Sequence, residues 1–138
     1  HLLQEALTGW MRGEITPREQ DESKATYFGQ VKKEEGIIDW RKTAVKIWRE
    51  IRAFQPWPGC FTTWKGKQLK INEASVIPVE TGIEYGIVVK LPEFEGGVGV
   101  TTGSGILKVL GIQYEGKKAM TAAEFIRGQR DFIGSKLE

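Results

Sequence analysis

The sequence predicts a small, mainly β domain with flanking helices, built as a barrel or sandwich of short strands. Short β-prone runs recur between residues 60 and 114, and nine of the 17 glycines fall between Gly82 and Gly116. Glycine at such spacing is typical of tight turns between short strands, because it accepts positive φ. Amphipathic helical patterns lie on either side of these runs. The chain has 138 residues and 40% hydrophobic content, which suits one modest domain.

The first pattern, residues 2–12, predicts a helix. Leu3, Leu7, Trp10 and Met11 have helical spacing, and Gly13 ends the pattern. A single helix of about eleven residues is marginal in water unless it packs on something. The helix therefore either docks on the following domain or belongs to a larger body, and we expect the second. Polar, turn-rich residues follow it.

Residues 38–54 carry the strongest helical pattern, with Asp39 as the expected N-cap and Pro56 blocking continuation. An apolar stripe is expected to face the core: Ala44, Ile47, Trp48, Ile51 and Phe54. The opposite face is basic: Arg41, Lys42, Lys46, Arg49 and Arg52. The stiff "QPWPG" segment that follows is expected to form a fixed corner between this helix and the first strand.

After the corner the pattern becomes strand-like. Lys65-Gly66-Lys67 predicts a hairpin turn between two β-prone runs. Further strands are expected at residues 75–79, 85–91, 98–102 and 105–114. A last helix should begin at Thr121, because Glu124 three residues later completes a capping box, and Met120 and Phe125 suit a hydrophobic staple.

Charge is segregated along the chain. Residues 41–70 contain eight Lys or Arg and one Asp or Glu, whereas residues 71–107 contain one and five. A basic helix beside a basic hairpin suits a phosphate backbone, although it also suits a solvated surface without a partner. Trp48 and Trp57 are expected to pack, and Trp64 is the better candidate for an exposed ring.

The composition excludes several kinds of active site. The one histidine is His1 and the one cysteine is Cys60, so a zinc site, a Ser-His-Asp triad or a Cys-His pair lacks its residues. Cys60 is interpreted as a small buried hydrophobe rather than a reactive thiol. No apolar run approaches the roughly 18 residues of a membrane span. We therefore expect a cytoplasmic protein with no membrane partner.

Five segments, in this order, resemble the C-terminal domain of methionyl-tRNA formyltransferases: "ATYFGQVKKEEGIIDW", "IRAFQPWPGCFT", "LKINEA", "TGSGIL" and "LGIQYEGKKAMTAAEFIRGQR". The resemblance implies an OB-like, Greek-key β-barrel at residues 38–138. It implies a linker at residues 14–37. Residues 1–13 would then be the terminal helix of an N-terminal catalytic domain outside this chain.

The resemblance also implies a function. The domain would bind methionyl-initiator tRNA while the catalytic domain, its other partner, transfers formyl from 10-formyltetrahydrofolate. This chain would hold no cofactor and no catalytic residue. Gln30 stands where the family often has lysine, and the nearby Lys32 is a candidate replacement. The expected RNA contacts are Lys32, Lys33, Arg41, Lys42, Lys46, Arg49, Arg52, Lys117, Lys118, Arg127 and Arg130.

Other functions stay open at this point. A sugar-nucleotide formyltransferase, or the hydrolase region of a formyltetrahydrofolate dehydrogenase, carries a related second domain. Neither needs a basic face toward RNA. The domain could also be a scaffold barrel, or a module that binds another protein, and missing nucleic-acid affinity would favour either role.

Overall fold

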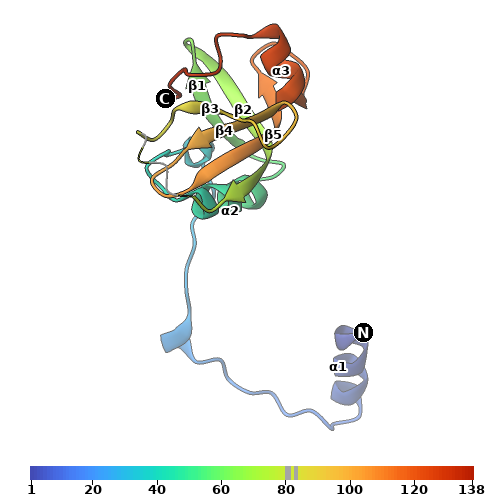
Figure 1. Ribbon diagram of the computed structural model, residues 1–138. Helices are drawn as coiled ribbons and strands as arrows, with labels where there is room; N and C mark the ends of the chain where they lie inside the picture. The colour runs from blue at the N-terminus through green and yellow to red at the C-terminus, as the bar shows by residue number, and fades with distance from the viewer. Residues whose placement is uncertain (80–81, 83) are drawn as a thin grey trace. The chain divides into compact units, whose positions relative to one another are not determined.

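The computed structural model describes residues 1–79, 82 and 84–138 (Figure 1). These residues form two compact units, residues 1–30 and residues 31–138. The first unit holds the helix α1 (Leu2–Met11) and a short 3-10 helix, η1 (Glu22–Lys24). The second unit holds the sheet, two further α-helices and a second 3-10 helix.

The helix α1 confirms the first helical pattern, but its apolar side chains have no cover within its unit. Leu3, Leu7 and Trp10 are 72%, 53% and 57% exposed, and the buried residue of the helix is Gly9. Its N-cap, His1, makes no side-chain capping hydrogen bond. That α1 is the last helix of another domain, followed by a linker, stays a prediction.

The second unit is built on a six-stranded antiparallel sheet. Its strands are β1 (Cys60–Trp64), β2 (Lys67–Ile77), β3 (Val88–Leu91), β4 (Gly97–Thr101), β5 (Ile106–Tyr114) and β6 (Met120–Thr121). The order is β1-β2-β5-β4-β3, with β6 beside β5. The strands β2 to β5 thus follow the order of a Greek key. The expected strand at residues 75–79 is instead the end of β2, which continues past a bulge near Glu73.

The sheet is open, so the closed barrel predicted from the resemblance is not confirmed. In the part of the chain that the structure describes, β1 and β3 are the two edges of the sheet. The C-terminal segment lies between them and bonds to both. Glu138 exchanges backbone hydrogen bonds with Thr63 of β1, and Leu137 N donates to Gly86 O next to β3. Hydrogen bonds from this irregular segment take the place of a strand pair that would close the sheet.

The main helix, α2 (Ala44–Ala53), is shorter than the predicted 38–54. The predicted cap at Asp39 is wrong, because the Thr43 side chain accepts from Lys46 N and caps the helix instead. Residues before Thr43 are held elsewhere: Ile38 N donates to Phe61 O, and the buried Trp40 indole N–H donates to Thr62 Oγ1 at 3.1 Å. These tertiary bonds hold the residues before Thr43 outside the helix, in a turn closed by Lys42 N donating to Asp39 O.

The inner face of the sheet and the apolar stripe of α2 form one core. Ala44, Ile47 and Ile51 of α2 are buried, as predicted, and Trp48 and Phe54 pack against the cluster while half-buried. The helix α3 (Ala122–Gly128) begins with the predicted capping box: Thr121 accepts from Glu124 N, and the Glu124 carboxylate accepts from Thr121 N.

Two of the tryptophan predictions are wrong. Trp64 was the candidate for an exposed ring, yet it is 3% exposed and makes edge contacts with Phe125 and Phe132. Trp57 was expected to pack in the corner, yet it is 60% exposed. In β1 alternate side chains point inward, and Trp64 shares the inward face with Cys60 and Thr62. In the corner the buried residue is Pro58, not Trp57.

The predicted turn between β1 and β2 is confirmed. Lys65 and Gly66 both have positive φ, 51° and 72°, as a two-residue hairpin loop of the I′ type requires. The turn fixes the register of the hairpin, with Trp64 opposite Lys67 and Phe61 opposite Lys70.

Candidate nucleic-acid interface

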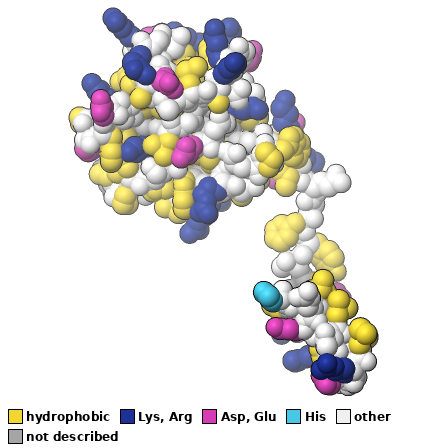
Figure 2. Space-filling view, turned by 90° about the vertical axis from the view of Figure 1, so that its right-hand side faces the viewer, with side chains coloured by type: hydrophobic (Ala, Val, Ile, Leu, Met, Phe, Trp, Pro, Cys, Tyr) yellow, Lys and Arg dark blue, Asp and Glu magenta, His cyan; other side chains and the backbone are white. Residues whose placement is uncertain are grey.

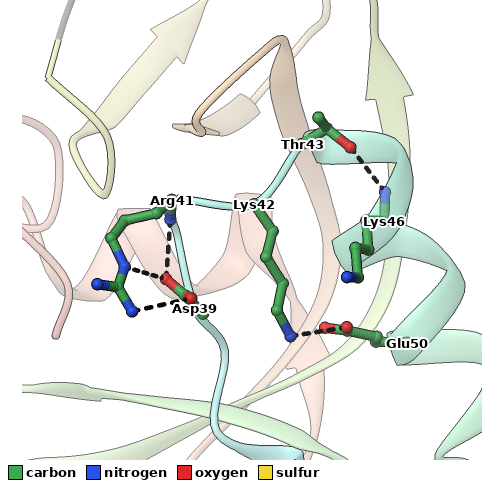
Figure 3. A network of polar contacts seen from close by, with 6 residues as sticks. All are labelled: Asp39, Arg41, Lys42, Thr43, Lys46 and Glu50. Carbon is green, nitrogen blue, oxygen red and sulfur yellow. Dashed lines mark hydrogen bonds and ion pairs between the residues drawn. The ribbon is translucent and has the colours of Figure 1, made fainter.

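The basic segment before α2 is held against the loop that joins β4 to β5. Gly103 N donates to the backbone oxygens of Trp40 and Lys42, at 2.9 and 3.0 Å. A Cβ at position 103 would lie 1.9 Å from Arg41 O, so only glycine permits this approach. The backbone that carries Arg41 and Lys42 is therefore fixed, and their side chains leave it in different directions (Figure 3).

Arg41 is paired with a carboxylate of its own segment. Its Nε lies 2.8 Å from Asp39 Oδ1, its second guanidinium nitrogen lies 3.1 Å from Oδ2, and its backbone N–H also donates to Oδ1 (Figure 3). These hydrogen bonds hold the pKa of Asp39 below its ordinary value. The Arg41 side chain is exposed, but two of its guanidinium donors already serve Asp39 and its charge is matched, which lowers its value as a phosphate contact.

Lys42 is also paired. Its Nζ lies 2.7 Å from Glu50 Oε1, and the two side chains are 30% and 20% exposed (Figure 3). The pair ties the segment before α2 to the middle of the helix. Lys65, in the hairpin turn, pairs with Asp131. Three of the eight cations in residues 41–70 therefore have carboxylate partners among the described residues.

The exposed face of α2 differs. Lys46 and Arg49 are three positions apart, both are exposed, and neither has an ion pair with any described residue. Residues at this spacing share a face of a helix. A third cation, Arg52, is also exposed, and its guanidinium carbon lies 4.6 Å from the centroid of the Trp48 ring. Stacking on an aromatic ring leaves the edge donors of a guanidinium free for phosphate.

The remaining predicted contacts lie on other elements. Lys32 precedes the 3-10 helix η2 (Lys33–Gly36), which begins with Lys33, and Lys117 and Lys118 lie in the turn between β5 and β6. Arg127 is in α3, and Arg130 follows it. All of these side chains are exposed, and none forms an ion pair with another described residue. Figure 2 shows Lys and Arg side chains at several places on one face of the domain, interleaved with hydrophobic and acidic side chains.

Two further cations, which were not among the predicted contacts, lie on β2. Lys67 is exposed and Lys70 is half-buried on the outer face of the strand. Lys70 alternates with the buried Leu69 and Ile71, which was a signal that its side chain points outward. Lys67 has the parity of Leu69 and Ile71 and lies at the exposed start of the strand.

A groove of about 880 Å³ runs between α2 and the start of α3. Trp48 and Ile51 line it from α2, and Gly111 and Met120 from the sheet. Arg52 and the carboxylates of Glu73 and Glu124 also line it. Its polar lining therefore carries both signs of charge.

The chemistry available outside these cations is limited. Burial raises the pKa of the Cys60 thiol to about 11, so it stays protonated at neutral pH. The described residues contain no group of three or more His, Cys, Asp or Glu able to hold a metal ion. Among the same residues, no helix has the length and apolar character to cross a bilayer.

The fold and surface together define a class: a β domain with a capped basic helix on its sheet and exposed, unpaired cations. Residues 30–130 match the formyl transferase C-terminal domain family. The chain belongs to this family, which confirms the resemblance found in the sequence.

Curated relatives named methionyl-tRNA formyltransferase share 36–46% identity with the chain. The protein of Coxiella burnetii is 39% identical over 94% of this chain and 41% of its own length. That of Dehalococcoides mccartyi is 46% identical over 88% of this chain and 38% of its own length. The Bacillus pumilus protein is 36% identical over 99% of this chain and 43% of its length. The chain thus spans about two fifths of these relatives.

Solved structures of HypX from Aquifex aeolicus share the fold. One variant has a TM-score of 0.66 at 20% identity, over 97% of this chain and 24% of HypX. Another structure, a complex of HypX with tetrahydrofolic acid, has a TM-score of 0.61 at 18% identity, over 95% of this chain and 23% of HypX. At this identity the likeness concerns the fold alone.

Proposed function

We propose that this chain is the tRNA-binding C-terminal domain of a methionyl-tRNA formyltransferase. In this role it binds methionyl-initiator tRNA while an N-terminal catalytic domain transfers formyl from 10-formyltetrahydrofolate to the methionyl amino group. Membership of the family and the names of the curated relatives support the enzyme class. In this proposal the folate site and the catalytic residues lie in the N-terminal domain, and the compartment is the cytoplasm.

The observation that carries the RNA-binding part is the exposed face of α2. Lys46 and Arg49 lie together there without carboxylate partners among the described residues, and the capped helix holds them in place. Cations of this kind position a phosphate backbone without reading its sequence. The other unpaired predicted contacts extend the surface: Lys32, Lys33, Arg52, Lys117, Lys118, Arg127 and Arg130.

We narrow the proposed set of RNA contacts at two positions. Arg41 and Lys42 were predicted as phosphate contacts, but their charges are matched by Asp39 and Glu50. We assign Lys42 to the stability of the domain and give Arg41 a minor part in binding. The charge available to RNA is therefore smaller than the sequence count suggests.

The test is tRNA binding by this chain between about 20 and 200 mM salt. If six to ten phosphates are contacted, affinity falls by roughly 10³–10⁵ between 50 and 200 mM; fewer contacts give a proportionally shallower slope. A Kd on the order of 10⁻⁴–10⁻⁶ M at physiological salt with a clear slope supports the proposal. No binding at 20 mM salt contradicts it and favours a scaffold domain, or a relative that acts on another substrate.

A further inference from the structure

We propose that Trp57 and the outer face of β1, β2 and β5 form a stacking surface for a single-stranded segment of RNA. The inference rests on the proposed RNA-binding function and adds to it a second surface with a different mode of contact. The face of α2 would neutralise phosphates, whereas this surface would hold unpaired bases.

The large aromatic ring of Trp57 is exposed to solvent. It is 60% exposed and lies between Pro56 and the buried Pro58. The ring stacks on no other ring or cation of the described residues, and its indole N–H has no hydrogen-bond partner among them. Flanking prolines restrict the backbone, so little conformational freedom is lost when a ligand stacks on the ring.

A second ring, that of Phe61, belongs to the same part of the surface. In β1 the side chains alternate between buried and half-buried, and Phe61 is on the outward, half-buried side. The backbone of Gly36 lies against both Phe61 and Pro58: a Cβ at Gly36 would be 3.2 Å from Phe61 Cε1 and 3.3 Å from Pro58 Cγ. Pro58, which follows Trp57, and the ring of Phe61 therefore both lie beside the backbone of Gly36.

Polar side chains continue the surface across the sheet. Phe61 is opposite Lys70, and Lys70 is opposite Gln113, so the three form a row across neighbouring strands. Neighbouring strands lie about 4.8 Å apart. All three side chains are half-buried on the outward face. A shallow hollow of about 180 Å³ adjoins the row, lined by Gln68, Lys70, Gln113, Tyr114, Glu115 and Gly116.

The hollow carries one charge of each sign, on Lys70 and Glu115. Lys70 has no ion pair with any described residue, and the turn carrying Lys117 is held over β5 because Gln113 Nε2 donates to Lys117 O at 3.1 Å. The nearest acid of the hollow, Glu115, accepts from Gln68 N at 3.0 Å. Side-chain amides offer donors and acceptors to base edges, and each base can stack on an aromatic ring.

The arrangement favours a single strand over a duplex. In a duplex the bases are stacked on each other, and their faces are closed to a protein ring. A single strand can place successive bases on Trp57 and Phe61 with its phosphates toward Lys70. The surface is continuous with η2, whose Lys33 is among the proposed phosphate contacts.

The experiment compares Trp57→Ala and Trp57→Phe with the wild-type chain, using a labelled 12-nucleotide single-stranded RNA and a duplex of the same sequence. Fluorescence anisotropy gives the Kd at low salt. We expect Trp57→Ala to weaken single-strand binding about 5- to 150-fold, since stacking contributes about 1–3 kcal/mol per base. Duplex binding should change less than twofold, and Trp57→Phe should keep most of the affinity. Phe61→Leu should weaken single-strand binding in the same direction.

The controls separate this inference from the proposed function. Trp57 is exposed, so Trp57→Ala should leave the urea midpoint unchanged, and the binding result then does not depend on folding. If Trp57→Ala binds the single strand as tightly as the wild-type chain, the stacking surface is wrong although RNA binding stands. An equal loss on both RNAs also contradicts it. If the wild-type chain binds neither RNA, the proposed function itself fails.

Discussion

The segment just before α2 and the exposed face of α2 carry similar positive charge, but their cations differ in whether they form ion pairs. In the first, Arg41 and Lys42 are paired with Asp39 and Glu50. In the second, Lys46 and Arg49 have no carboxylate partner in the described part of the chain. Under the proposed function, the contribution of a cation to RNA binding should therefore depend on its partners in the fold. This dependence predicts different consequences for removing charge in the two places.

The largest expected effect follows from removing the unpaired pair. Lys46→Gln with Arg49→Gln should weaken tRNA binding about 10- to 60-fold near 0.1 M salt, if each cation neutralises one phosphate. Anisotropy titration with tRNA measures the loss. The free energy of unfolding should change by less than about 0.5 kcal/mol, because both side chains are on the surface. A loss below threefold would mean that α2 does not contact the RNA.

Removing Lys42 should affect the fold more than the binding. Lys42→Met leaves the half-buried Glu50 carboxylate without its partner. The cost should lie between that of an exposed and that of a buried pair, about 1–2 kcal/mol in urea unfolding. Lys46→Met is the matched control and should cost less than about 0.5 kcal/mol. If Lys42→Met and Lys46→Met lower the free energy of unfolding equally, the Lys42–Glu50 pair does not stabilise the fold.

Losing the hydroxyl of Thr43 should lower the free energy of unfolding by about 1 kcal/mol. This hydroxyl caps α2 and so orients the first turn, which carries Lys46. Thr43→Ala removes the capping acceptor and should lower the free energy of unfolding by about 0.5–2 kcal/mol. Thr43→Ser keeps the hydroxyl and should lose much less. If serine and alanine are equally destabilising, the methyl group rather than the cap is responsible.

The smallest effect concerns pH. The pKa of Asp39 is lowered by its hydrogen bonds with Arg41, so the unfolded chain binds the proton more tightly than the folded chain. The stabilisation is therefore present above the unfolded pKa, near 4, and is lost as pH falls through the lower folded pKa. Asp39→Asn should make unfolding stability less sensitive to pH below about 5. An unchanged pH profile would show that the exposed pair does not stabilise the fold.

Local sequence signals predicted the elements that depend on neighbouring residues. The turn at Lys65 and Gly66 needs positive φ, and the capping box of α3 needs Thr121 and Glu124 three residues apart. The apolar stripe of α2 likewise follows from helical periodicity. Each of these signals is complete within a few residues, and the structure confirms each of them.

The wrong predictions concern features that depend on residues far away in the sequence. Asp39 satisfies a local rule for an N-cap, but Trp40 bonds to Thr62 of β1 and holds this segment outside the helix. Trp64 is adjacent to a turn, yet its inward position in β1 brings it to Phe125 and Phe132. Closure of the sheet depends on the C-terminal segment, whose bonds to both edges no local pattern indicates.

The same limit applies to the interface. Counting Lys and Arg in residues 41–70 indicated a basic surface, but the partners Asp39 and Asp131 lie outside that window. The sequence therefore predicted which cations are exposed better than which are unpaired. Lys70 was left out of the predicted contacts, although its alternation with Leu69 and Ile71 indicated an outward side chain.

The most direct test compares the salt dependence of tRNA binding in two double variants of equal charge change. One is Lys46→Gln with Arg49→Gln, and the other is Arg41→Gln with Lys42→Gln. The first should reduce the slope of log K against log salt by about 2, and the second by less than about 0.5. Equal reductions in the two variants would contradict the claim that pairing with carboxylates decides which cations contact RNA.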